Sequence, residues 1–422
     1  MARRLEVISN HLGEKPQTMA KGLKTQYVKD PIKFMGLEDL IPMSLNTKRM
    51  QLREILDRDV APLLPEFIEK AQFPREVLGK IKGLFGLSEA KYGCRQVTPR
   101  EKSIILYELA RVDTSLATFY ALTMSLVIYT IEALGSEEQK AKYLPGLCNL
   151  DLIGCWGLTE PDFGSDASGL QTTATPVDGG FILNGSKRWI GNAIISDIMV
   201  IWAKNTKTNK IEGFVIPSKT PGIHVKNIDR KLGLRMVQNG VITLIDVKVP
   251  ITTRLEKATN FANGVKVVLE HSRVSIAWIA TGMLSGVYEA SVKHLRERIQ
   301  FGVPIGAFQL NQEKLVRVLG HFHSCFLLAW RITELQEQGK ATSGQAGLVK
   351  AITSLIGRDA VRLGREMLGG DGILIDNYVM KALADMEIVY TYEGTYDINA
   401  LVAGEAITGI SAFKSSYSLR KK

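Results

Sequence analysis

The chain has 422 residues, 45% of them hydrophobic and 23% charged, which suits two or three globular domains and argues against disorder. Its net charge of +10 suits an anionic ligand, but no basic run is interleaved with aromatic residues as in a nucleic-acid groove, so we predict no nucleic-acid partner. Apolar runs shorter than about 18 residues predict no membrane span, and the scattered cysteines predict no metal site.

The first 150 residues are predicted to be mostly helical. Residues 1–43 hold scattered Pro and Gly with little periodicity, so we expect an extended arm. Residues 44–150 show helical periodicity and are predicted to form an N-terminal helical domain. Its expected helices begin at Thr47, cover 99–113 and 115–134, and begin again after the N-cap Ser136 to end at Pro145.

The pattern changes after Leu150. Short β-rich runs between Gly, Asn and Pro turns predict a middle β domain over residues 151–262. Helical periodicity then returns, which predicts a C-terminal helical bundle over 263–414 and a basic tail over 415–422. The fold class is therefore α+β. The expected strands include 181–183, 198–203, 213–216 and 241–249, and the expected helices include 276–290, 315–326, 345–368 and 376–388.

One carboxylate near the C-terminus stands in a setting suited to proton abstraction. Glu393 lies in Tyr390-Thr-Tyr-Glu-Gly-Thr-Tyr-Asp-Ile-Asn399, where aromatic neighbours exclude water and Gly394 allows a tight turn or close approach to a ligand. Desolvation raises the pKa of a carboxylate toward neutrality, where a general base works best. The same residues also suit a Glu at a helix end beside a loop glycine.

The segment Tyr392-Glu-Gly-Thr395, with Ala406-Ile-Thr-Gly-Ile-Ser-Ala-Phe413 downstream, resembles the C-terminal signature of the acyl-CoA dehydrogenase and oxidase superfamily. The resemblance implies an N-terminal α-helical domain, a middle β-barrel-like domain and a C-terminal four-helix bundle. It implies that Glu393 removes the pro-R α-proton of an acyl-CoA while the β-hydride goes to N5 of FAD, leaving a trans-2-enoyl-CoA. Gly394 would then lie against the substrate.

Two motifs of the middle region resemble the family's flavin-binding segments. Cys155-Trp-Gly-Leu-Thr-Glu-Pro-Asp-Phe-Gly-Ser-Asp166 implies a flavin and pantetheine segment, and Ser186-Lys-Arg-Trp-Ile-Gly-Asn192 a strand beside the isoalloxazine. Gly191 replaces the family's Thr or Ser, and our hypothesis is that the gap it leaves favours access by O2. The residues implied to bind FAD here are Trp156, Leu158, Thr159, Ser165, Trp189, Ile190 and Gly191, and Ser165 would also contact CoA.

Two C-terminal motifs resemble segments that contact FAD across a subunit boundary. These are Arg298-Ile-Gln-Phe-Gly-Val-Pro304, with a following Gln, and Leu368-Gly-Gly-Asp-Gly372. An Arg suits a diphosphate because its planar fork donates two hydrogen bonds at once. The resemblance implies that Arg273 lies near bound CoA. The implied FAD contacts are Arg298, Phe301, Gln309, Gly369 and Gly370, with Thr395 and Asp397 from the loop of the base.

Within the family, the chain is most similar to plant peroxisomal short-chain acyl-CoA oxidase and to glutaryl-CoA dehydrogenases. Ala110 and Ala117 stand where glutaryl-CoA enzymes carry a Glu and an Arg, so a buried distal carboxylate would lack its partner. Glutaryl-CoA is therefore not the expected substrate.

We predict a homotetrameric FAD enzyme of fatty acid β-oxidation that desaturates short straight-chain acyl-CoA and passes electrons to O2. Resemblance implies a peroxisomal enzyme, although Ser418-Leu-Arg-Lys-Lys422 contains no Ser-Lys-Leu tripeptide. One alternative is a dehydrogenase, for which a mitochondrial location is possible, that passes electrons to electron-transfer flavoprotein. Another is a catalytically silent structural flavoprotein subunit.

Overall fold

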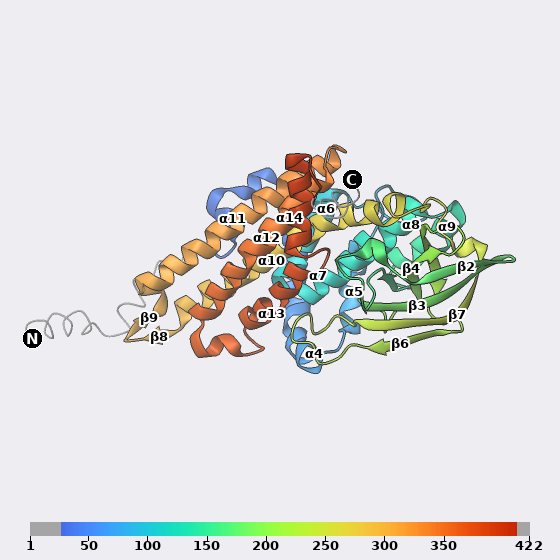
Figure 1. Ribbon diagram of the computed structural model, residues 1–422. Coiled ribbons are helices and arrows are strands. Elements are labelled where there is room, and N and C mark those ends of the chain that lie inside the picture. Colours follow the sequence, from blue (N-terminus) through green and yellow to red (C-terminus); the bar gives the residue numbers. More distant parts are fainter. Residues whose placement is uncertain (1–26, 412–422) are drawn as a thin grey trace, which may run out of the picture.

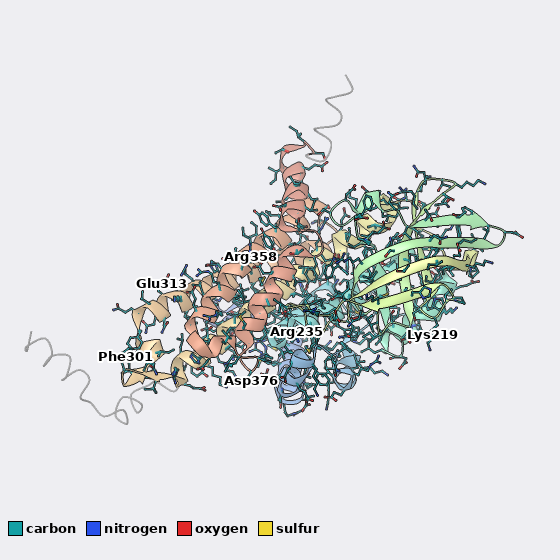
Figure 2. All side chains as sticks on the ribbon, turned by 60° about the horizontal axis from the view of Figure 1, so that its bottom comes forward. Lys219, Arg235, Phe301, Glu313, Arg358 and Asp376 are labelled. Carbon is teal, nitrogen blue, oxygen red and sulfur yellow. The ribbon has the colours of Figure 1, made fainter. Side chains whose placement is uncertain are left out.

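The computed structural model describes residues 27–411, which form an N-terminal group of helices, a middle sheet and a C-terminal set of long helices. The long helices run side by side, and the sheet lies at the opposite end of the molecule (Figure 1). Figure 2 shows Phe301 at the far tip of the helical part and Lys219 on the sheet. The predicted α+β fold class is confirmed.

The N-terminal helices begin where the sequence supplies capping side chains. Thr98 accepts a hydrogen bond from the backbone N–H of Glu101, Asp113 caps the next helix, and Ser136 forms a capping box with Gln139. A π-helical stretch, Leu122–Ile128, joins α7 to α8. The helices are α3 (Met43–Ile55), α4 (Leu64–Lys70), α5 (Leu78–Ile81), α6 (Pro99–Val112), α7 (Thr114–Ala121), α8 (Tyr129–Leu134) and α9 (Glu137–Cys148).

Among the described residues, one helical stretch is long and apolar enough to cross a membrane. It spans Thr114–Leu134, and 89% of its apolar window is buried inside the protein. Its apolar side chains face other helices of the same chain, as expected for the core helix of a folded domain.

Two details of the N-terminal part differ from the predictions. Residues 31–35 and 37–40 form short 3-10 helices in which Ile32 is fully buried, so this part of the predicted arm is folded against the bundle; residues 1–26 lie outside the described part. Helix α9 continues through Pro145 to Cys148. Pro145 cannot donate to the carbonyl of Ala141, so α9 continues past it at the loss of one backbone hydrogen bond.

The middle domain is a seven-stranded sheet. Strand β4 (Ile198–Asn205) pairs in parallel with β1 (Gly154–Gly157) and β2 (Thr173–Val177) along one edge and antiparallel with β5 (Ile211–Pro217) along the other. Antiparallel pairing then adds β3 (Gly180–Ile190), β7 (Gly240–Pro250) and β6 (Ile223–Asn227). Strands β2 and β6 were not predicted, because β6 in particular is too exposed to show apolar alternation.

A bulge interrupts β3 near its end. The register between β3 and β7 shifts between Lys187 and Ile190, so Arg188 and Trp189 leave the ladder, and Trp189 adopts a left-handed φ of 64°. A bulge re-aims the side chains that it carries. Trp189 consequently remains 52% exposed.

Helix α10 (Val267–Glu297) is the central rod of the C-terminal domain. It packs against α6, α11 (Gln309–Glu337), α12 (Ser343–Met367) and α13 (Tyr378–Thr391). Gly282 permits the approach to α6, because a Cβ there would lie 2.3 Å from the carbonyl oxygen of Tyr107. A small hairpin of β8 (Ile299–Gln300) and β9 (Val303–Pro304) follows α10, and α14 (Tyr396–Thr408), not predicted as a helix, packs on α12.

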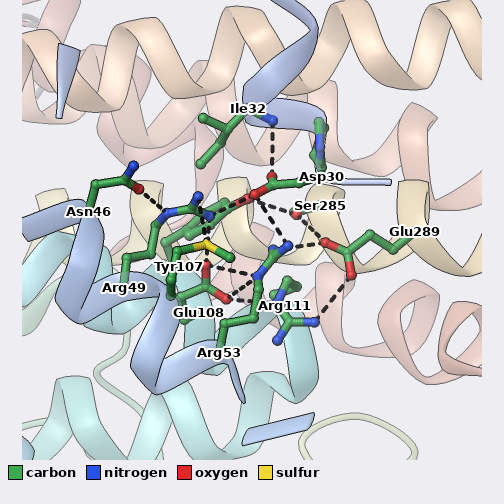
Figure 3. A network of polar contacts seen from close by, with 12 residues as sticks. Asp30, Ile32, Asn46, Arg49, Arg53, Tyr107, Glu108, Arg111, Ser285 and Glu289 are labelled. Atoms are coloured by element: carbon green, nitrogen blue, oxygen red, sulfur yellow. Dashed lines mark hydrogen bonds and ion pairs between the residues drawn. The ribbon is translucent and has the colours of Figure 1, made fainter. Parts of the chain in front are cut away.

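A buried network of charges fixes α10 to the N-terminal part (Figure 3). Glu108 of α6 is fully buried and accepts hydrogen bonds from Arg49 at 3.1 Å, Arg53 at 3.1 Å and Arg111 at 2.7 Å. Arg53 and Arg111 also pair with Glu289 of α10, at 2.8 and 3.2 Å. The network therefore joins α3, α6 and α10.

Asp30 ties the predicted arm to the same network. Its carboxylate pairs with Arg49 at 2.9 Å and with Arg53 at 3.3 Å. Burial alone would raise the pKa of Asp30, but the nearby Arg53 and Arg49 hold it below its ordinary value. This buried pairing holds the described part of the predicted arm against the helices.

We expect Glu108→Gln to lower the free energy of unfolding by about 3–5 kcal/mol, because three buried guanidinium groups lose their shared counter-charge. Chemical denaturation followed by circular dichroism measures this. Glu66→Gln is the matched control, since Glu66 forms an exposed pair with Lys70 and its loss should leave the unfolding midpoint almost unchanged. Equal midpoints for the two variants would contradict a stabilising role for the network.

Candidate active site

Glu393 lies in the short loop between α13 and α14. Its φ of 54° and the φ of 80° at Gly394 are both left-handed, which turns the chain sharply at the carboxylate. The hydroxyl of Ser272, in the first turns of α10, donates a hydrogen bond of 2.6 Å to Glu393 Oε2. Sequence separation hides this contact, which joins residues 121 positions apart.

The surroundings of Glu393 set its proton affinity. Burial raises the pKa of Glu393, and the Ser272 hydrogen bond and the nearby charges of Arg273 and Lys350 oppose this rise without cancelling it. A carboxylate with a raised pKa binds a proton more tightly than an exposed one. Glu393 is therefore a stronger base than an exposed carboxylate, which suits it to general-base chemistry.

Two buried side chains hold the Glu393 loop by its backbone. Lys350 of α12 donates from Nζ to the carbonyl oxygens of Tyr390 at 3.0 Å and Gly394 at 2.6 Å. Asn399 of α14 donates from Nδ2 to the carbonyls of Glu393, Gly394 and Thr395, at 3.2, 2.8 and 3.0 Å. Both residues were missed by sequence reasoning, although a lysine on the apolar face of a helix is a detectable signal.

The two predicted flavin segments lie together at one end of the sheet. The backbone N–H of Arg188 donates to the carbonyl of Thr159 at 2.8 Å, and Lys187 Nζ donates to the carbonyl of Leu158 at 3.2 Å. Lys187 also forms a buried ion pair of 2.8 Å with Glu160. The ends of β1 and β3 are thereby fixed to each other.

The predicted residues of these segments differ in exposure. Trp156 is buried and donates from Nε1 to Thr130 Oγ1 at 3.1 Å, and Leu158 and Ile190 are also buried, so their backbones rather than their side chains are available to a ligand. Trp189 presents half of its ring surface, and Ser165 is exposed in the loop after β1.

Tyr392, directly before the base, and Gly191, directly after the predicted flavin strand, contact one helix. Thr118 Oγ1 lies 3.3 Å from the hydroxyl of Tyr392, directly before Glu393. One turn further along, Leu122 lies against Gly191, since a Cβ at Gly191 would be 2.5 Å from Leu122 Cδ1. Residues four apart share a helix face, so the loop of Glu393, through Tyr392, and the turn at Gly191 after β3 contact the same helix face.

The gap predicted at Gly191 is absent because Leu122 lies there. The missing Thr or Ser side chain does not leave open space, because the Leu122 side chain occupies it. The hydroxyl is absent, but an apolar group fills the position beside the strand.

Five predicted FAD contacts lie far from the base: Arg298, Phe301, Gln309, Gly369 and Gly370. At 1.5 Å per residue, the path along α10 from Ser272 to Arg298 is about 39 Å. Phe301 is 79% exposed at the tip of the bundle (Figure 2). One chain does not bring these residues to Glu393, which agrees with the implied contact to a neighbouring subunit.

The remaining predicted residues lie near the Glu393 loop. Thr395 caps α14, its hydroxyl accepting from the N–H of Ile398 at 3.2 Å, and Asp397 is exposed in the first turn of that helix. Arg273 is buried and donates to Ser343 at 3.1 Å, while its Nε has no hydrogen-bond partner among the described residues. An unpaired buried guanidinium donor suits an anionic ligand.

These observations fit a flavin dinucleotide. The half-exposed Trp189 ring offers an apolar face beside the flavin strand. Nothing lies within 4 Å of where a Cβ would stand at Gly369 or Gly370, so bare backbone can approach a ligand. Arg298 forms no ion pair with any residue in the described range and is free to meet a diphosphate.

Three family models match the chain in order. They describe the N-terminal, middle and C-terminal domains of acyl-CoA dehydrogenases and match residues 46–151, 155–247 and 263–408. Every predicted site residue lies within these three ranges.

Similar proteins agree with these models. An acyl-CoA dehydrogenase of Bacillus subtilis is 29% identical over 86% of this chain and 97% of its own length. Butyryl-CoA dehydrogenase of Megasphaera elsdenii is 28% identical, with a TM-score of 0.82 over 87% of this chain and 98% of its own.

Two structures of glutaryl-CoA dehydrogenase from Mycobacterium smegmatis are 32% and 30% identical, with TM-scores of 0.87 and 0.88. Each match covers 91% of this chain and 99% of the other, and the second of these structures is a complex with FADH2. The predicted superfamily and its glutaryl-CoA dehydrogenase branch are thus confirmed, and the chain belongs to the acyl-CoA dehydrogenase family of FAD-dependent oxidoreductases.

Proposed function

We propose that this protein desaturates an acyl-CoA between its α and β carbons, with Glu393 as the general base. The observation that carries the proposal is the Glu393 loop: the partly buried carboxylate accepts a hydrogen bond from Ser272, and the neighbouring Tyr392 contacts the same helix that packs against Gly191 at the end of β3. A base and a flavin must lie on either side of the same carbon–carbon bond for this reaction.

The chain's own residues bind, orient and deprotonate the substrate. Glu393 takes the α-proton, and the thioester is left with a double bond as a hydride departs from the β carbon. FAD, when bound, accepts that hydride. Ser272 holds the carboxylate in place, and the unpaired Nε of Arg273 offers a hydrogen bond to an anionic part of the CoA.

An unbranched acyl chain without a distal charge is the substrate class we favour. Ala110 and Ala117 are fully buried, so neither position offers a partner for a second carboxylate. A carboxylate buried there would lack a counter-charge, which costs several kcal/mol. The butyryl-CoA dehydrogenase among the similar structures acts on a substrate of this class.

Electron-transfer flavoprotein is the acceptor that we now favour over O2. The similar proteins named above are dehydrogenases, and Leu122 fills the space beside Gly191 through which we expected O2 to enter. An oxidase remains the second candidate because the hydroxyl expected at position 191 is absent. We propose a mitochondrial location with the first acceptor and a peroxisomal one with the second.

We also propose that the protein works as a homotetramer. Arg298 lies about 39 Å along α10 from Ser272, and Gly369 and Gly370 follow the end of α12, about 26 Å along the helix from Lys350, so a second copy has to bring them to FAD. Exposed apolar side chains surround these residues, which favours burial against another subunit. They are Ile299, Phe301, Phe308, Leu310, Ile373, Leu374 and Ile375.

We expect Glu393→Gln to retain FAD and bind butyryl-CoA but to reduce its flavin about two to four orders of magnitude more slowly, the usual contribution of a positioned base. Anaerobic stopped-flow absorbance with butyryl-CoA measures the reduction. Glu387→Gln, on the exposed face of α13, is the control and should be reduced normally. Near-normal reduction of Glu393→Gln would remove Glu393 from its assigned role.

The Ser272 hydrogen bond should determine where the base titrates. Without it the pKa of Glu393 rises further, so Glu393 is protonated over a wider pH range and the acid limb of the reduction rate moves to higher pH by about one unit. Ser272→Ala tests this in a pH series of flavin reduction. Ser275→Ala is its control, because Ser275 bonds Ser125 instead, at 2.9 Å. If both variants keep the wild-type acid limb, Ser272 does not tune the base.

The acceptor can be tested after anaerobic reduction by butyryl-CoA. We expect slow reoxidation in air and fast reoxidation by electron-transfer flavoprotein. Gly191→Thr and Gly191→Ala both crowd Leu122, but only Thr restores a hydroxyl. Fast reoxidation in air that slows in the Thr variant and not in the Ala variant would establish the oxidase instead.

A further inference from the structure

Lys350 is a fully buried lysine that pairs with no carboxylate in the described part of the chain. Both acceptors of its Nζ are backbone carbonyls, those of Tyr390 at 3.0 Å and Gly394 at 2.6 Å. Burying an ammonium group without an ion-pair partner is unfavourable. Packing alone therefore does not account for a lysine at position 350.

The two carbonyls lie on either side of the base. Tyr390 is in the last turn of α13 and Gly394 directly follows Glu393, so Lys350 holds both ends of the segment between them. A cation also interacts favourably with the carbonyl end of a helix. The contact fixes the loop to α12 rather than leaving it attached only through its own chain ends.

This segment needs restraint because its backbone is strained. Glu393 has a left-handed φ of 54°, a conformation that is unfavourable for a residue with a Cβ. Asn399 supplies hydrogen bonds to the same loop but no charge. Lys350 therefore combines the positional restraint with a positive charge.

Lys350 and Glu393 each shift the pKa of the other. Burial lowers the pKa of Lys350 to about 7, with Glu393 opposing this change and Arg273 adding to it. In turn, Lys350 and Arg273 favour the ionised form of Glu393. The α14 side of the loop contributes the neutral Asn399.

We propose that Lys350 is a positioning residue for the base: from α12 it fixes the backbone on both sides of Glu393 and favours the carboxylate form. The proposal rests on the function proposed for Glu393. Lys350 itself contacts loop carbonyls rather than the substrate, so its effect passes through the geometry and titration of Glu393.

Lys350→Met tests the proposal, since Met fills the buried space but has no donor and no charge. We expect flavin reduction by butyryl-CoA to slow about 100-fold, as for a reacting group misplaced by about 1 Å. Its acid limb should move to higher pH, because the pKa of Glu393 rises when the neighbouring cation is lost. FAD content and butyryl-CoA affinity should stay near the wild-type values.

Two further variants separate positioning from general destabilisation. Lys350→Arg retains the charge, so it should restore the wild-type acid limb while recovering only part of the rate. Thr353→Val is the matched control on the same buried face of α12, since its hydroxyl bonds only carbonyls of its own helix. A wild-type rate in Lys350→Met, or a slower rate with an unmoved acid limb, would overturn the proposal.

Infrared titration of the Glu393 carboxyl group provides a readout that does not depend on turnover. The protonated carboxyl band is taken as the difference from Glu393→Gln, and its midpoint should rise by about one pH unit in Lys350→Met. An unmoved midpoint would contradict the proposal. If wild-type flavin is reduced by no acyl-CoA and the midpoint still shifts, the proposed function fails while the role of Lys350 stands.

Discussion

Buried lysines that donate to loop carbonyls hold both halves of the site. Lys187 reaches the carbonyl of Leu158, and Lys350 reaches those of Tyr390 and Gly394. Loops beside a desolvated site cannot rely on water for their backbone acceptors, and an ammonium group offers three donors. Burial disfavours the charged form of both lysines. It lowers the pKa of Lys187 to about 8 and that of Lys350 to about 7.

The same desolvation creates an opposing requirement at Glu393. A base near neutral pH needs a raised pKa, which burial supplies, but it must also be ionised before the substrate is deprotonated. Ser272 and Arg273 partly offset burial from α10, and Lys350 does so from α12. Three groups from two helices therefore set one titration, and their effects are not additive because they act on one carboxylate.

Residues in compact motifs could be singled out from the sequence, whereas the contacts that support them could not. Glu393 and the Trp189–Gly191 strand belong to compact motifs, and the fold class follows from periodicity. Lys350 stands out as a lysine on an apolar helix face, but its partners and those of Lys187 lie in segments distant in the chain: backbone carbonyls for both lysines, and Glu160 as well for Lys187. The prediction of a gap at Gly191 was wrong for a similar reason. Leu122, which fills the space, comes from a helix about 70 positions earlier. Asp30, within the predicted arm, is fixed by charge pairing with Arg49, a contact that apolar periodicity does not reveal.

Helix α10 links the site around Glu393 to Arg298, a predicted FAD contact at the other end of the helix. Its first turns place Ser272 on the base, and the chain leaves its last turn at Arg298, about 39 Å away along the axis. A helix of this length holds Ser272 and Arg298 at a fixed separation only if it does not bend or slide. The buried charges of Glu108, Arg53 and Glu289 fix its middle to α6 and α3, where a shift would separate paired charges in a low-dielectric interior. The buried charge network is distant from Glu393. By fixing the middle of α10, it limits how far one end of the helix can move relative to the other.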